Sequence, residues 1–168
     1  MNATHFHLLI NHIPILGSFF GLALLAAGAV SHGGRLWLTR AAFAFFIVVG
    51  ATAIPANLSG EEAEDQVEKI AGVTHHAIHE HEEAAEAAWV VASILGAVSL
   101  GAWLLQQRNH RLQRPALLAV WALAMLTAGL MARTGYEGGL IRRPELRGEL
   151  NQGIDSAERA AERAESGH

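Results

Sequence analysis

Histidine is the residue type in this chain that is most able to do chemistry. The 168 residues include ten His and no Cys. The lack of Cys excludes disulfides, iron–sulfur clusters and thiolate zinc sites. A neutral imidazole is a good ligand for haem iron, copper or zinc, and it also carries protons near neutral pH. The chemistry open to this sequence is therefore metal or haem ligation, or proton transfer, by histidine.

One candidate histidine opens a long apolar run. His12 follows Asn11, and Pro14 comes two residues later. A polar Asn–His pair at the head of an apolar segment is costly in lipid and usually faces a bundle interior or a cavity. Pro14 either begins a helix or kinks it, and in both cases it frees a backbone carbonyl near His12. We interpret His12 as a ligand or proton carrier; the alternative is an interfacial histidine whose ring reaches water.

A second group of histidines lies among acidic residues. Thr74 can cap a helix that begins at His75. On such a helix the residues with metal-binding side chains share two adjoining faces: His75, His76, His79, Glu82 and Glu83. Two His four residues apart can chelate one zinc or copper ion, although no metalloprotease motif fits any register. The alternative is a solvated acidic helix whose His titrate with neighbouring Glu.

The elements that must position these residues are membrane helices. The chain is 51% hydrophobic and only 17% charged, whereas soluble domains carry about 25% charged residues. Its four predominantly apolar segments approach the length of about 20 residues that crosses the hydrocarbon core of a bilayer. These segments are residues 8–30, 38–58, 85–105 and 115–132. The sequence predicts an all-α fold, an integral membrane four-helix bundle in a lipid bilayer.

The remaining segments complete the predicted organisation. Residues 59–86 form an extramembrane, His/Glu-rich helical loop between spans two and three. Residues 1–147 make up the membrane domain, and residues 148–168 are a charged, solvated tail. The first apolar segment lacks a preceding basic region and is too long for a signal peptide, so we expect it to remain as a span.

Small residues in two spans predict close helix packing. Gly17 and Gly21 are four residues apart on the first span, and Ala97 and Gly101 repeat the spacing on the third. Such pairs let helix backbones approach one another in lipid. The alternative is that they are ordinary glycines of membrane helices.

An even number of spans gathers the candidate residues at one membrane face. The N-terminal segment, the 59–86 loop and the segment after the fourth span must share a side, which places seven of the ten His together. The two short loops at 31–40 and 106–114 carry five Arg and no acid, so the positive-inside rule puts them in the cytoplasm. With Lys69 and the Arg residues after the fourth span included, each side of the membrane carries five basic residues. The short loops have more basic residues per unit length, so we assign them to the cytoplasmic side.

Two short motifs resemble a known family. The segment His7-Leu-Leu-Ile-Asn-His12-Ile-Pro14-Ile resembles the H-x4-H-x-P-I opening of a bacterial family of four-helix inner-membrane proteins of unknown function. The segment Thr134-Gly135-Tyr136-Glu137-Gly138-Gly139 looks like that family's T-G-x-x-G-G motif after the fourth span. The resemblance implies a multi-pass protein of the bacterial inner membrane, and a haem-ligand or redox-site role for His7 and His12. The acidic middle loop and the charged tail depart from the family pattern.

These observations favour a redox protein that binds haem b. Two His on facing helices of a membrane bundle commonly hold a b-type haem. We expect His12 and His81 to be the axial pair. Arg142 and Arg143 would neutralise the propionates, with lipid-headgroup binding as their alternative role. The site would lie at the periplasmic face, together with both termini.

The predicted function is electron transfer, or an accessory role beside other subunits of a membrane redox complex or a soluble cytochrome. The alternative is a non-catalytic membrane subunit or divalent-metal-binding module that uses the His/Glu-rich loop. An enzyme with a His–Glu metal centre ranks last, because no catalytic motif matches. A net charge of −4 without a basic block argues against nucleic acid as a partner.

Overall fold

Five α-helices make up the described part of the chain. The computed structural model describes residues 3–67, 75–108, 113–143, 145 and 148, so the predicted tail lies almost entirely outside the described residues. The helices are α1 (Ala3–Ile10), α2 (His12–Val30), α3 (Arg35–Val67), α4 (His75–Arg108) and α5 (Gln113–Arg142). Within these described ranges there is no β-strand.

The predicted fold class is confirmed. Four helical segments are long and apolar enough to cross a membrane: His5–Val30, Arg35–Glu62, His75–Arg108 and Arg114–Ile141. The described parts of the predicted loop at 59–86 are helical, and they continue the spans themselves. α3 runs on to Val67, and α4 already begins at His75. The second and third spans therefore extend beyond the lengths that hydropathy alone predicts.

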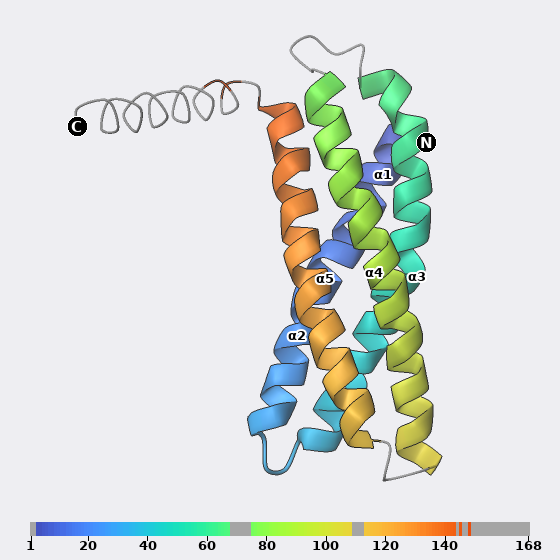
Figure 1. Ribbon diagram of the computed structural model, residues 1–168, viewed down its shortest axis with the longest axis vertical. Helices are drawn as coiled ribbons and strands as arrows, with labels where there is room; N and C mark the ends of the chain where they lie inside the picture. Colours follow the sequence, from blue (N-terminus) through green and yellow to red (C-terminus); the bar gives the residue numbers. More distant parts are fainter. Residues whose placement is uncertain (1–2, 68–74, 109–112, 144, 146–147, 149–168) are drawn as a thin grey trace, which may run out of the picture.

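A local break divides the first span into α1 and α2. Asn11 lies between them with helical dihedral angles (φ −63°, ψ −24°), and its N–H donates to the His7 carbonyl at 3.0 Å. Pro14 has no N–H to donate to the Ile10 carbonyl, which weakens the helix at this turn. As a result, α1 packs against α3, whereas α2 crosses obliquely to contact both α3 and α5 (Figure 1).

The helices form a closed up-and-down bundle. α2 packs against α3, α3 against α4, α4 against α5, and α5 back against α2. α1 and α4 begin, and α3 and α5 end, at the same end of the bundle (Figure 1). The described residues nearest the N-terminus, the middle loop and the tail therefore share one end, as the span count predicts.

Glycines set the closest helix contacts, and the sequence identifies only some of them. A Cβ added to Gly17 would lie 2.8 Å from Val49 Cγ2, and one added to Gly21 would lie 2.5 Å from the ring of Phe46. Both glycines of the first span therefore give α2 its close approach to α3. This part of the packing prediction is confirmed.

The packing prediction for the third span is wrong. Ala97 is exposed, and an added Cβ on Gly101 would meet nothing within 4 Å. Gly96 makes the contact instead, because its added Cβ would lie 3.1 Å from Gly50 Cα on α3. Ala97 and Gly101 do repeat the small-residue spacing, but they lie on the face of α4 that does not contact α3.

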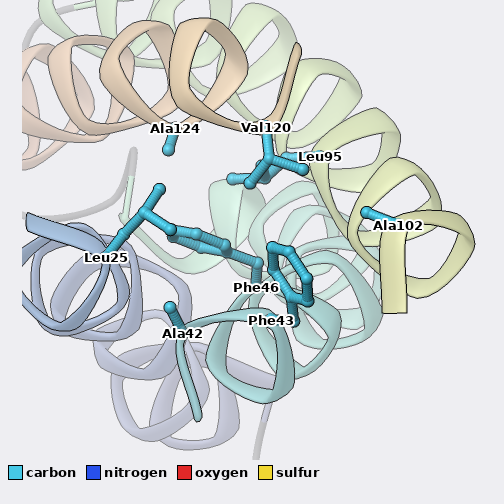
Figure 2. Packing of buried hydrophobic residues seen from close by; sticks show 8 residues of the cluster. All are labelled: Leu25, Ala42, Phe43, Phe46, Leu95, Ala102, Val120 and Ala124. Carbon is cyan, nitrogen blue, oxygen red and sulfur yellow. The ribbon is translucent and has the colours of Figure 1, made fainter. Parts of the chain in front are cut away.

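Aromatic and small apolar side chains fill the interior. Figure 2 shows the central cluster, formed by Leu25, Ala42, Phe43, Phe46, Leu95, Ala102, Val120 and Ala124. A second cluster lies nearer the end that carries the histidines and consists of Val49, Ala53, Ala88, Ala92 and Met131. Large apolar side chains also cover the outside, with Leu9 at 68% and Leu118 at 69% exposure. An outer surface of this kind is suited to lipid.

Candidate functional site: a pair of histidines held by backbone carbonyls

His7 of α1 is held against the last part of α3. Its Nδ1 lies 2.9 Å from the Ala56 carbonyl oxygen and 3.3 Å from Ser59 Oγ, which itself donates to the same carbonyl at 3.0 Å. Gly60 makes room for the ring, since a Cβ there would lie 3.1 Å from His7 Cε1. α3 thus supplies both an acceptor and a space one helical turn further along.

His81 of α4 is held against α5 in the same way. Its Nδ1 lies 3.1 Å from the Thr134 carbonyl oxygen. Gly138 provides the space, because a Cβ there would lie 3.1 Å from His81 Cε1 and 3.3 Å from Nδ1. Thr134 and Gly138 are the first and fifth residues of the T-G-x-x-G-G segment. This segment therefore serves to seat His81.

The two histidines are equivalent members of a pair. Each ring donates to a carbonyl of the neighbouring helix and lies against a glycine four residues after that carbonyl. α1 and α4, which carry the rings, both flank α3 at the same end of the bundle. Both rings are partly buried.

The hydrogen bonds fix the tautomer of both rings. A carbonyl oxygen only accepts, so Nδ1 must carry the proton in each ring. In the neutral ring Nε2 then has a free lone pair. Of the three ring atoms nearest to the added Cβ of Gly60 and of Gly138, Nε2 is the farthest, at 3.9 Å and 3.8 Å. An imidazole whose other nitrogen donates to a backbone carbonyl is the usual form of a histidine metal ligand.

His12, the predicted partner of His81, lies elsewhere. His12 is exposed on the outer side of α2. Its Nδ1 donates to the Leu8 carbonyl, one helical turn earlier in the same span, at 2.8 Å. The residue that is held at the same end as His81, against a carbonyl of a neighbouring helix, is His7 instead. The reason is geometric, because five residues along a helix correspond to a rotation of about 140°, so His7 and His12 face different sides.

The predicted metal-binding residues of the loop do not form a cluster in the described part of the chain. His75, His76 and His79 are exposed, and His79 Nε2 lies 3.4 Å from Glu83 Oε1, a pair typical of a solvated helix face. Glu82 is half-buried. No group of three or more His, Asp or Glu that could hold a metal ion occurs among the described residues.

The predicted propionate partners are only partly described. Arg142 is the last residue of α5, and its side chain lies outside the described residues. Arg143 is exposed, and its N–H donates to the Leu140 carbonyl at 3.3 Å. The structure therefore does not test their predicted role.

Sequence reasoning missed the residues of α3 that hold His7. Ala56, Ser59 and Gly60 carry no motif of their own. Their one signal is a Ser-Gly pair at the point where the apolar span gives way to acidic residues. The sequence predicts that the extramembrane loop begins at this pair, whereas α3 runs through it without interruption.

The fold and the site together define a class: a bundle of four helices long and apolar enough to cross a membrane, with two partly buried imidazoles at one end that each bond to a neighbouring helix. No protein-family profile, curated protein or solved structure matches the chain. The resemblance drawn from the two motifs therefore stays a prediction.

Proposed function

We propose that this protein binds a b-type haem between His7 and His81 and acts in electron transfer. One observation carries the proposal: two imidazoles on helices that flank α3 each donate Nδ1–H to a backbone carbonyl, which leaves both Nε2 atoms for an iron. Four-helix bundles build cofactor sites in this way, from side chains on facing helices. A bound haem supplies one-electron chemistry, and the chain's own residues hold and orient it.

The residues beside the pair fit a flat, apolar ligand. Gly60 and Gly138 keep side chains away from the rings. Ala84 and Ala88 follow His81 on α4 and are buried with small side chains. His12 is not part of this proposal, and Arg142 and Arg143 retain their proposed role as propionate partners.

We place the site at the periplasmic face of a bacterial inner membrane, with other redox subunits or a soluble cytochrome as electron partners. The basic short loops support this orientation. The alternative function, a divalent-metal module on the His/Glu-rich helix, has weaker support because its histidines point into solvent. A zinc or copper ion remains the alternative ligand of the His7–His81 pair itself.

The test is the visible absorption spectrum of the detergent-purified protein. We expect a Soret band that is lost in His7→Ala and in His81→Ala. His12→Ala is the matched control and should keep the band, because His12 lies on the outer face of α2. Thermal unfolding of each variant shows whether the bundle still folds.

Two results would refute the proposal. A purified protein without visible absorbance, even after haem is added, would exclude haem. A band lost in His12→Ala and kept in His7→Ala would restore the pairing of His12 with His81. Metal analysis of the colourless protein would then distinguish a zinc or copper site from a pair without a ligand.

A further inference from the structure

The end of the bundle opposite the histidine pair is basic and contributes no acidic residue of its own. α2 and α4 end there, and α3 and α5 begin there (Figure 1). The segments that meet at this end, residues 31–40 and 106–114, contain five Arg. All 16 acidic residues of the chain belong to residues 61–86 or 137–165. These two segments therefore hold no carboxylate that could neutralise their guanidinium groups.

Arg40 is the arginine of this end that the fold holds in place. Its Nε donates to Gln106 Oε1 at 3.1 Å, which joins α3 to α4. Arg40 is half-buried, whereas Arg35, Arg108 and Arg114 are exposed around it. Within the described residues the bond to Gln106 is the only hydrogen bond of the Arg40 side chain, so its two terminal nitrogens still require an acceptor. A charged group in a span is costly unless it is paired, so a counter-ion has to come from outside the described chain.

The position of Arg40 along α3 matches the depth of lipid headgroups. α3 begins at Arg35, five residues earlier, which corresponds to about 7.5 Å of helix. The headgroup layer on each side of the hydrocarbon core is about 5–7 Å thick. A long basic side chain that starts at the edge of the hydrocarbon extends toward this layer. The terminal nitrogens of Arg40 can therefore meet a phosphate while Nε stays on Gln106.

Trp37 lies on the same face of α3 as Arg40. It precedes Arg40 by three residues, a spacing that makes the two side chains neighbours on a helix. Trp37 is 64% exposed. Indole rings prefer the headgroup layer, where the ring meets lipid and the N–H finds an acceptor. This face of α3 is thus open on the outside of the bundle at the depth where phosphates lie.

We infer that this end of the bundle binds the phosphate of an anionic phospholipid, with Arg40 as its main contact. The planar guanidinium group suits a phosphate, because two of its N–H groups can donate to two oxygens at once. The exposed arginines around it favour a headgroup with a net negative charge over a zwitterionic one. The inference goes beyond the proposed function, since it concerns the opposite end of the bundle and requires no haem.

The experiment is native mass spectrometry of the intact protein in detergent, titrated with phosphatidylglycerol or phosphatidylcholine of identical acyl chains. We expect the protein to retain phosphatidylglycerol in preference to phosphatidylcholine. Arg40→Met should lower this preference about fivefold, which corresponds to about 1 kcal/mol for one basic side chain at an anionic surface. Gln106→Leu should lower it as well, although it removes no charge, because Arg40 is then no longer held.

Arg133→Met is the matched control. It also removes one positive charge, but at the other end of the bundle, where Arg133 Nη2 lies 3.8 Å from Glu80 Oε2. The lipid preference of this variant should equal that of the unaltered protein. An excess of glycerol phosphate, the soluble headgroup, should not displace the lipid.

Three results would overturn the inference. Equal retention of the two lipids would show that only acyl chains bind. Equal losses in Arg40→Met and Arg133→Met, or an unchanged preference in Gln106→Leu, would show diffuse attraction by net charge. Displacement by glycerol phosphate would show a site for free phosphate. Thermal unfolding checks that each variant folds, and Gln106→Leu decides the question if Arg40→Met does not fold.

Discussion

The glycine that seats His81 allows a sharp test of the paired-histidine site. In Gly138→Ala the new methyl group would lie 3.1 Å from His81 Cε1 and 3.3 Å from Nδ1. Both separations are shorter than an ordinary contact, so the ring must move by a few tenths of an ångström. Its hydrogen bond to Thr134 is already 3.1 Å long, near the upper end of the range for N–H···O bonds of about 2.7–3.2 Å. The ring therefore has little room to retreat without losing this bond.

The expected magnitude follows from two opposing effects. Replacing a helical Gly with Ala stabilises the helix by about 1 kcal/mol. Overpacking against a fixed ring costs about 1–3 kcal/mol. Gly139→Ala is the matched control, because its added methyl group meets nothing within 4 Å. We expect Gly138→Ala to be less stable than Gly139→Ala by about 1–3 kcal/mol.

The affinity for the proposed ligand of His81 gives a second measure of the displacement of the His81 ring. Disturbing the group that orients a metal-ligating histidine typically lowers affinity by about 10–100-fold. Thermal unfolding and the absorbance of retained cofactor, measured for both variants in the same detergent, check the two expectations. Equal stability and equal cofactor content in the two variants would show that the position of the His81 ring does not matter, which would refute the reasoning.

Three further outcomes are expected. Gly96→Val should destabilise the bundle by about 1–3 kcal/mol, because the new side chain meets the backbone of α3. Gly101→Val should change stability little, because its new side chain points into open space. Denaturant unfolding of the two variants compares these effects. Ser59→Ala removes a hydroxyl that donates to the Ala56 carbonyl and should lower the free energy of unfolding by about 1 kcal/mol. The proposed cofactor should be retained, because the shorter 2.9 Å bond from His7 Nδ1 to the Ala56 carbonyl remains when the 3.3 Å contact with Ser59 is lost; a cofactor-free variant would contradict this. Glu83→Gln replaces the carboxylate that lies 3.4 Å from His79 on an exposed helix face and should change stability by less than about 1 kcal/mol; a larger change in the unfolding midpoint would count against a solvated helix face.

Hydropathy was sufficient to predict the four spans, but not their interior faces. Each span of a membrane bundle is apolar toward lipid as well as toward its neighbours, so polarity does not distinguish the two sides. For this reason the sequence could not decide whether His7 or His12 faces His81. The same ambiguity explains why Gly101 was selected on the third span when Gly96 makes the contact.

The site was predictable only in part for a second reason. His81 and the T-G-x-x-G-G segment are both recognisable in the sequence, but the hydrogen bond between them joins residues 53 positions apart. The acceptor is a backbone carbonyl, which every residue possesses, so side-chain identity gives no sign of it. The helical state of residues 75–86 was predictable, because it depends on local residues.

The two histidine hydrogen bonds also bear on how the protein is assembled. Each one joins the two arms of a single helical hairpin: His7 connects the first arm to α3, and His81 connects α4 to α5. Each half of the chain therefore contains everything needed to close its own bond during insertion, and the first half can do so before the second is synthesised. The pair of free ring nitrogens arises only when the finished halves meet. Under the proposed function, uptake of the ligand would report completed assembly, because a half inserted alone presents only one imidazole of the pair.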